Sequence, residues 1–260
     1  MKKLSVIVIT RNEEKNIKRC LESVKWADEI VLVDSYSTDK TVEIARGYTD
    51  KIYSTEPKGF AEPDREFAVS RTSNEWVFLI DADEMVSEEL RQEIAAVLEA
   101  PAFEVYMVPR KTFFSGKPVL GCGWYPSYIP RLFKKGKVFF PAHTHANGDI
   151  LTGQVARLKS DLLHYTYASV GEWMDKFNRS TTLQAMEQYK DGKRITVKNI
   201  FIELFVRPLY FFTLKYFLLK GYRDGWRGFF VSVSSGLVVF FVFIKLWEIR
   251  ESKMEGDPAV

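Results

Sequence analysis

The chain has 260 residues, of which 46% are hydrophobic and 15% aromatic, enough apolar material for one large domain or a domain with an appendage. Its formal net charge of +3 is close to neutral and argues against a nucleic-acid-binding protein. The two cysteines, Cys20 and Cys122, are far apart in the sequence and offer neither a disulfide framework nor a metal-ligand spacing. A reducing compartment therefore fits the chain.

The first apolar run, residues 4–9, is too short for a signal peptide and is followed at once by charged residues. We interpret it as a first strand, and we expect a cytoplasmic protein.

The first hundred residues alternate short apolar runs with segments of helical spacing. The predicted strands are residues 4–9, 30–33, 51–53 and 76–80; the predicted helices are 13–24, 41–45, a segment around 67–70, and 87–98. This alternation is typical of a parallel, doubly wound α/β sheet, which binds its ligands at the carboxyl ends of the strands. Asp34 and Asp81 both lie at such ends.

After Pro101 the pattern changes to short strands, predicted at residues 105–108, 129–133 and 137–140 and separated by Gly and Pro. They indicate a mixed extension of the sheet that shapes a second substrate pocket. A helix is predicted again over residues 169–189.

The last third combines positive charge with aromatic residues. Residues 190–227 contain nine basic side chains against three acidic ones, and residues 228–244 contain no charge at all. The uncharged run could be a spanning helix, part of an interfacial amphipathic hairpin, or a buried core helix. The flanking cations and aromatics favour the interfacial hairpin.

An acidic cluster, Asp81-Ala82-Asp83-Glu84, follows the strand at residues 76–80 directly. Two acids this close fit poorly with an acid/base pair acting across a sugar. They could ligate a divalent cation, or form a solvated loop in which Glu84 caps the next helix. The D-x-D pattern alone does not decide between these two.

Four motifs add context in this order: SVIVITRNEEKNI, IVLVDSYSTDKTVEIA, GFAEPDREFAVS and WVFLIDADE. Together they resemble the nucleotide-sugar domain of family 2 glycosyltransferases. The resemblance implies the GT-A fold, a Rossmann-like, mostly parallel sheet flanked by helices, here followed by a C-terminal helical, membrane-associating extension. The later motifs GWYPSYIPRLFKKGKVFF and LLHYTY are similar to the lipopolysaccharide-core beta-1,4-glucosyltransferase branch.

The resemblance divides the chain into three parts. Residues 1–100 would form the nucleotide-sugar-binding half of the GT-A domain, residues 101–190 its acceptor-binding half, and residues 191–260 an amphipathic membrane-associating region.

The resemblance also assigns the donor site. The residues implied in nucleotide-sugar binding are Thr10, Asn12, Glu13, Asp34, Asp39, Arg65, Asp81 and Asp83. Asp83 would ligate Mg²⁺ or Mn²⁺ directly, while Asp81 would lie near the ribose and a water of the metal shell. Without the resemblance, Asp34 and Asp39 would be interpreted as turn and capping residues.

Inversion at the sugar needs a base. Relatives of this branch carry a Val-His-Glu triplet where this chain has Thr144-His145-Ala146, so the expected carboxylate is missing. Asp149 and His145 are the replacement candidates, with Glu84 a third that is better explained as a helix cap. His164 is either a structural histidine or a ligand near the diphosphate.

Acceptor binding is predicted for three residues. Trp124 and Tyr125 could stack on a sugar, and Arg131 could bind a core phosphate. Core packing for the aromatics and a solvated hairpin for the arginine are the simpler alternatives.

The predicted function is that of an inverting, metal-dependent glycosyltransferase. It would move a hexose, with glucose favoured, from a UDP-sugar to a lipopolysaccharide-core or other lipid-linked saccharide, while peripherally bound to the inner face of the inner membrane. A polyprenyl phosphate or an exopolysaccharide intermediate is the alternative acceptor. A catalytically silent nucleotide-sugar or membrane-surface binding protein is the alternative class.

Overall fold

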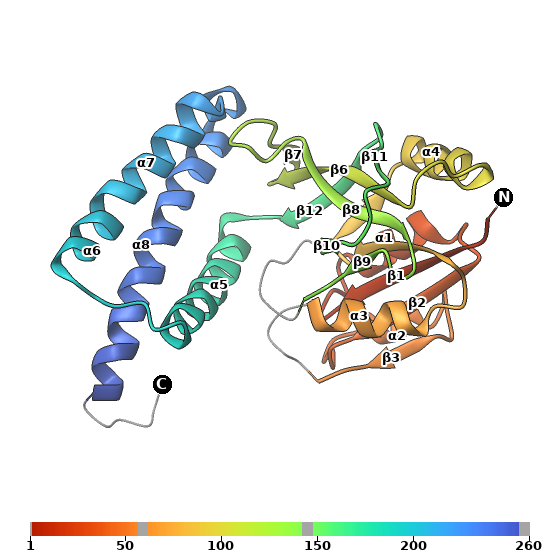
Figure 1. Ribbon diagram of the computed structural model, residues 1–260, viewed down its shortest axis with the longest axis horizontal. Coiled ribbons are helices and arrows are strands. Elements are labelled where there is room, and N and C mark those ends of the chain that lie inside the picture. The colour runs from red at the N-terminus through yellow and green to blue at the C-terminus, as the bar shows by residue number, and fades with distance from the viewer. Residues whose placement is uncertain (1, 57–61, 142–147, 255–260) are drawn as a thin grey trace. The chain divides into compact units, whose positions relative to one another are not determined.

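The computed structural model describes residues 2–56, 62–141 and 148–254 (Figure 1). The chain forms two compact units. The first comprises Met1–Thr112 and Pro126–Thr166, and the second Phe113–Tyr125 and Tyr167–Val260.

The first unit is built on a long sheet with the strand order β3-β2-β1-β4-β8-β6-β12-β5. Its first four strands are parallel: β3 (Ile52–Ser54), β2 (Glu29–Asp34), β1 (Leu4–Thr10) and β4 (Trp76–Asp81). This is the parallel half that the alternating sequence pattern predicted.

The other half of the sheet is mixed, as the irregular pattern after Pro101 predicted. Antiparallel pairs join β4 to β8, β8 to β6 and β12 to β5, whereas β11 runs parallel to β6. A separate two-stranded sheet is formed by β9 and β10. The bounds are β5 (Glu84–Val86), β6 (Val105–Phe114), β8 (Ser127–Lys134), β9 (Val138–Phe139), β10 (Asp149–Ile150), β11 (Val155–Arg157) and β12 (Leu162–Tyr167).

Both faces of the parallel half are covered, so every residue of β1 is buried. Its alternating side chains enter two different hydrophobic clusters. Val6 and Val8 pack with α1 (Ile17–Val24), α2 (Thr41–Ala45) and α4 (Glu88–Glu99). Ile7 and Ile9 pack on the opposite face, with α3 (Glu62–Arg71). The sheet is therefore doubly wound, and its strand ends are held from both sides.

The second unit is mainly helical. It also contains the last residues of β6, which pair antiparallel with the short strand β7 (Lys117–Pro118). The helices are α5 (Val170–Lys190), an arm of four consecutive helical segments, a short 3₁₀ turn (Gly221–Asp224), and the long α8 (Trp226–Met254). The arm consists of α6 (Val197–Phe201), the π-helical turn η1 (Ile202–Val206), α7 (Arg207–Thr213) and the π-helical turn η2 (Leu214–Leu218). The predicted helical C-terminal extension is confirmed.

Two glycines let α8 approach its neighbours at backbone distance. A Cβ at Gly228 would lie 1.8 Å from the carbonyl oxygen of Gly221, and one at Gly236 would lie 2.7 Å from that of Pro208. No other residue fits at Gly228 without moving the backbone. The glycines that interrupt the uncharged run are therefore packing residues between α8, the arm and the 3₁₀ turn.

On another side α8 packs against α5. Trp173 and Phe177 of α5 contact Phe230 and Phe241. Near the other end of α8, the ammonium nitrogen of Lys245 lies within hydrogen-bond distance of four oxygens on α5, at 2.7–2.9 Å. Within the described residues, Trp226–Ser252 is the one helical stretch long and apolar enough to cross a membrane, and 39% of its most apolar part is buried in the structure.

Candidate functional site

The site lies at the carboxyl ends of the parallel strands in the first unit. Thr10 at the end of β1 pairs in register with Asp34 at the end of β2, and Ile9 pairs with Asp81 at the end of β4. The sheet thus brings the two predicted donor-site acids to neighbouring strand ends, where doubly wound folds bind their ligands.

The loops after β1 and β2 interlock through side chains. The Asn12 amide donates to Ser37 Oγ at 2.8 Å, and the Thr38 amide donates back to Asn12 Oδ1 at 2.8 Å. Asn12 has a φ of 52°, a left-handed conformation that Asn tolerates better than most residues. The Glu13 amide donates to Thr41 Oγ1 at 2.8 Å, so the two loops form one rigid surface.

Asp34 and Asp39 shape that surface. Asp34 is 2% exposed and accepts hydrogen bonds from the amide and hydroxyl of Ser37. Asp39 accepts from the amides of Thr41 and Glu14 at 3.0 and 3.1 Å. Burial tends to raise the pKa of Asp39, but the hydrogen bond from the Thr41 hydroxyl, together with those from the two amides, outweighs it and lowers the pKa below its usual value. Turn chemistry is thus one role of both residues, and their contact with a nucleotide stays a prediction.

Thr10 supplies an unsatisfied polar atom in the same place. Its side chain is 3% exposed, and its hydroxyl has no hydrogen-bond partner within the described part of the chain. A buried hydroxyl without a partner is unfavourable, so this position is suited to a ligand that offers one.

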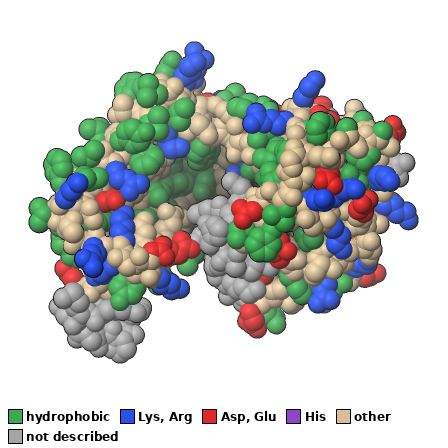
Figure 2. Space-filling view, in the orientation of Figure 1, with side chains coloured by type: hydrophobic (Ala, Val, Ile, Leu, Met, Phe, Trp, Pro, Cys, Tyr) green, Lys and Arg blue, Asp and Glu red, His purple; other side chains and the backbone are tan. Residues whose placement is uncertain are grey.

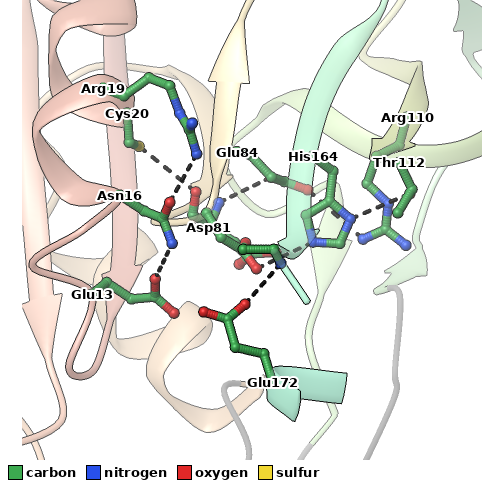
Figure 3. Close-up of polar contacts among 12 residues, drawn as sticks. Glu13, Asn16, Arg19, Cys20, Asp81, Glu84, Arg110, Thr112, His164 and Glu172 are labelled. Carbon is green, nitrogen blue, oxygen red and sulfur yellow. Dashed lines mark hydrogen bonds and ion pairs between the residues drawn. The ribbon is translucent and has the colours of Figure 1, made fainter. Parts of the chain in front are cut away.

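Charged side chains cluster around Asp81, and Figure 3 labels Asp81, Glu84 and Arg110 of this group. Asp81 binds Arg131 Nη2 at 2.6 Å and Arg65 Nη2 at 3.1 Å. Burial would raise the pKa of Asp81, but the guanidinium groups of Arg131 and Arg65 outweigh it and hold the pKa well below its usual value. Asp81 is therefore a fixed, ionised acceptor.

Glu84 occupies a different place from the one predicted. It begins β5, has no exposed side-chain surface, and accepts from Arg131 at 2.8 and 2.9 Å and from the Asp81 amide at 3.0 Å. Ser87 caps α4 by accepting from the Leu90 amide, so the expectation that Glu84 caps this helix is wrong. A fully buried, doubly engaged carboxylate is also poorly placed to take a proton from an acceptor hydroxyl.

Arg131 also differs from expectation. The predicted acceptor contact required an accessible guanidinium, whereas Arg131 is 3% exposed and bridges Asp81 and Glu84. Burial would lower the pKa of Arg131, but the two carboxylates outweigh it and raise the pKa above its usual value. Arg110 lies 3.7 Å from Glu84 and adds a second cation to the group.

Asp83 faces His164 across the strand ends. β12 pairs antiparallel with β5, which places His164 opposite Glu84 and its Nε2 at 3.3 Å from Asp83 Oδ2. The other ring nitrogen, Nδ1, lies 3.3 Å from the Thr112 hydroxyl (Figure 3). Both Asp83 and His164 are mostly buried but keep some exposed surface. The sequence analysis offered a place near the diphosphate as one of two roles for His164, and the pairing of β12 with β5 is what places it beside Asp83.

The remaining predicted residues lie elsewhere. Asp149 is exposed at the start of β10, and His145 lies outside the described residues. Trp124 and Tyr125 belong to the second unit, where the ring of Trp124 packs against Tyr167 with 6.5 Å between centroids. Their roles in catalysis and acceptor binding stay predictions.

The parallel strands, the interlocked loops and the acids at the strand ends define an α/β domain of the GT-A type. Residues 5–124 match the family model for glycosyl transferase family 2. A lipopolysaccharide core biosynthesis glycosyltransferase of Rhizobium meliloti is 30% identical, with 94% of this chain and 92% of that protein covered. The chain belongs to glycosyl transferase family 2, and it is a glycosyltransferase.

Other proteins are also similar to this chain. An uncharacterized glycosyltransferase of Rickettsia typhi is 29% identical over 100% of this chain and 91% of its own. Among solved structures, S. aureus TarS 1–349 covers 98% of this chain and 92% of its own at 18% identity, with a TM-score of 0.48. Glucosyl-3-phosphoglycerate synthase from Mycobacterium tuberculosis, in complex with Mn²⁺, UDP and glucosyl-3-phosphoglycerate, matches at 17% identity over 75% of this chain and 82% of its own, with a TM-score of 0.49.

Proposed function

We propose that this glycosyltransferase moves a hexose, with glucose favoured, from a UDP-sugar to a lipopolysaccharide-core acceptor, with inversion and with the help of a divalent cation. The observation that carries the donor half is the pair Asp83 and His164 at the strand ends, beside the loops that hold Asp34 and Asp39. The name of the Rhizobium meliloti relative supports a core acceptor.

The Asp83–His164 pair suits one metal ion. The Asp83 carboxylate and the His164 imidazole, 3.3 Å apart, are the residues that would hold a divalent cation here. Thr112 orients the imidazole from the other side, as outer-shell partners of metal-bound histidines do. Carboxylate ligands suit Mg²⁺ and Mn²⁺ alike, and an imidazole favours the transition metal Mn²⁺. When bound, the cation would neutralise charge that develops on the leaving diphosphate.

The chain's own residues would hold the nucleotide. Asp81, ionised by Arg65 and Arg131, offers a fixed acceptor to a ribose hydroxyl. Asp34 and the buried Thr10 hydroxyl offer polar contacts at the next two strand ends. Asp149 is exposed in β10 and lies within the described residues; it is the candidate there for the base that takes the proton of the acceptor hydroxyl.

Calorimetry and product analysis test this proposal. UDP should bind in the presence of Mn²⁺ and much more weakly after chelation. A panel of UDP-sugars is then incubated with core oligosaccharide or undecaprenyl phosphate, and the product is identified by mass spectrometry and NMR. Transfer only to undecaprenyl phosphate would replace the proposed acceptor, and undetectable UDP binding with Mn²⁺ would contradict the donor.

We further propose that the enzyme works on the cytoplasmic face of the inner membrane, held there by the arm of the second unit. Large apolar side chains are exposed at helical spacing along the arm, at Val197, Phe201, Phe205 and Leu209, each at least 62% exposed. Figure 2 shows hydrophobic side chains interspersed with Lys and Arg over this region. Apolar residues that enter a monolayer between cations that meet anionic headgroups are typical of interfacial helices.

The packing of α8 argues against a membrane-spanning role. One side of α8 is bound to α5 through Lys245 and its four acceptors. α5 exposes Asp175, Arg179 and Lys190. A spanning α8 would draw these charges into hydrocarbon, which is strongly unfavourable.

The double substitution Phe205→Glu/Leu209→Glu is expected to reduce binding to phosphatidylethanolamine–phosphatidylglycerol vesicles about tenfold or more, because it puts charge in place of inserted apolar surface. Vesicle flotation measures this. Met174→Glu is the matched control, since Met174 is an exposed apolar residue of α5, and it should float normally. If the native enzyme stays in the membrane fraction after extraction with alkaline carbonate, the result would instead favour a membrane-spanning α8.

A further inference from the structure

The helical unit contains a cavity of about 90 Å³ bounded by α5, the loop after it, the arm and α8. The floor includes the buried side chains of Val242 and Phe243. The polar lining consists of Gln184, Gln188, Lys193, Glu203 and Arg207. A cavity of this size holds about three water molecules, or one group the size of a phosphate.

The lining carries one net positive charge. Glu203 is 7% exposed and accepts from Lys193 Nζ at 2.8 Å and from Arg207 Nη1 at 2.8 and 3.0 Å. Arg207 makes both bonds through one nitrogen, so its planar fork has donors left for a further acceptor. A monoanion such as a phosphodiester would neutralise the lining.

Gln188 adds a requirement for a hydrogen-bond donor. Its side-chain oxygen is buried and has no partner in the part of the chain that the structure describes. The neighbouring Gln184 is already engaged, since its amide donates to Ser180 Oγ at 3.0 Å. A ligand that satisfies the cavity therefore brings both an anion and an N–H or O–H group.

The surroundings of the cavity favour a lipid over a free anion. Phe205, Val206 and Leu209 flank Glu203 and Arg207 in the sequence of the arm and are 62%, 46% and 66% exposed. An inorganic anion gains nothing from such apolar surface. A glycerophospholipid can place its phosphate in the cavity and its acyl chains along the arm.

We propose that this cavity binds the headgroup of a glycerophospholipid whose headgroup carries a hydrogen-bond donor, ethanolamine or glycerol. The phosphate meets Lys193 and Arg207, and the headgroup N–H or O–H donates to Gln188. The inference rests on the proposed membrane docking and adds a lipid preference to it. Phosphatidylcholine, whose choline has no N–H or O–H, is the discriminating ligand.

Calorimetry of the full chain with dihexanoyl lipids, kept monomeric, tests the site without any vesicle. The ethanolamine and glycerol lipids should bind at least about tenfold more tightly than the choline lipid. Gln188→Met, which removes the acceptor without changing charge, should abolish this preference while leaving phosphate-dependent binding. Arg207→Gln should weaken binding of all three lipids about tenfold or more, whereas Lys198→Gln, an equal loss of charge on the exposed surface of α6, should not.

Equal binding of the choline lipid, or an unchanged preference in a folded Gln188→Met protein, would overturn the proposal. Inorganic phosphate binding as tightly as the ethanolamine lipid would also overturn it, since the cavity would then be a free-anion site. If dihexanoyl lipids bind but vesicle flotation fails, the docking proposal fails alone. If flotation succeeds and dihexanoyl lipids do not bind, the cavity proposal fails alone.

Discussion

Replacing Asp83 with Asn is expected to reduce glycosyl transfer by about 10²–10³-fold, because an amide of the same size cannot supply the negative charge that holds the cation beside His164. Initial rates with a UDP-sugar and Mn²⁺ measure the loss. Calorimetry should show in parallel that the Mn²⁺ dependence of UDP binding is weakened.

Two further variants sharpen this test. Asp50→Asn makes the same chemical change at an exposed position before β3 and should leave the rate unchanged. The His164→Gln protein should still bind UDP, but the amount by which Mn²⁺ supports this binding better than Mg²⁺ should fall, because the imidazole is the ligand that favours Mn²⁺. Full activity of the Asp83→Asn protein with either ion would contradict a metal role for this residue.

Replacing Arg131 with Met is expected to destabilise the first unit by about 3–5 kcal/mol, because the fully buried carboxylate of Glu84 and the partly buried carboxylate of Asp81 would lose the cation that they share. For a domain of this size the melting temperature should fall by roughly 10 °C. Thermal unfolding followed by circular dichroism measures the change.

The pairing itself is tested by a second substitution. Arg131→Met/Glu84→Gln also removes the buried negative charge of Glu84 and should recover part of the lost stability. Arg157→Met, at an exposed arginine that stacks on Tyr128, should change stability by about 0.5 kcal/mol or less. An Arg131→Met protein as stable as the native enzyme would show that the carboxylates find other partners.

Much of the first unit could be predicted from local sequence. β1 and β4 are continuous apolar runs because both faces of the parallel sheet are covered, and each ends in a polar residue at the ligand edge. The Ser87 cap also follows from local chemistry, because a hydroxyl before Glu88 satisfies a free amide of the first turn. Family motifs then assigned Asp81 and Asp83 to the site.

The partners of those acids could not be predicted, because they depend on antiparallel pairing between distant strands. Arg131 sits in the run of five buried residues 129–133 in β8, so no alternation along that part of the strand marks it as an inward-facing cation. His164 reaches Asp83 only through the pairing of β12 with β5. Glu84 lies between a D-x-D motif and a helix, a position that suggested a helix cap. Its burial depends on the ion pair with Arg131, a residue distant in the sequence.

The two backbone contacts of α8 also set a mechanical limit. Gly228 and Gly236 lie eight positions apart, just over two helical turns, and each touches a different carbonyl. A shift of α8 by one helical turn would move both glycines about 5.4 Å away from the carbonyls that they approach. It would also separate Lys245 from the four oxygens that surround its ammonium group. These contacts fix the position of α8 along its axis. Since α8 packs against both the arm and α5, the exposed apolar residues of the arm keep a fixed position relative to α5. If the arm docks on a membrane as proposed, these backbone contacts would help to set how deeply it enters the lipid layer.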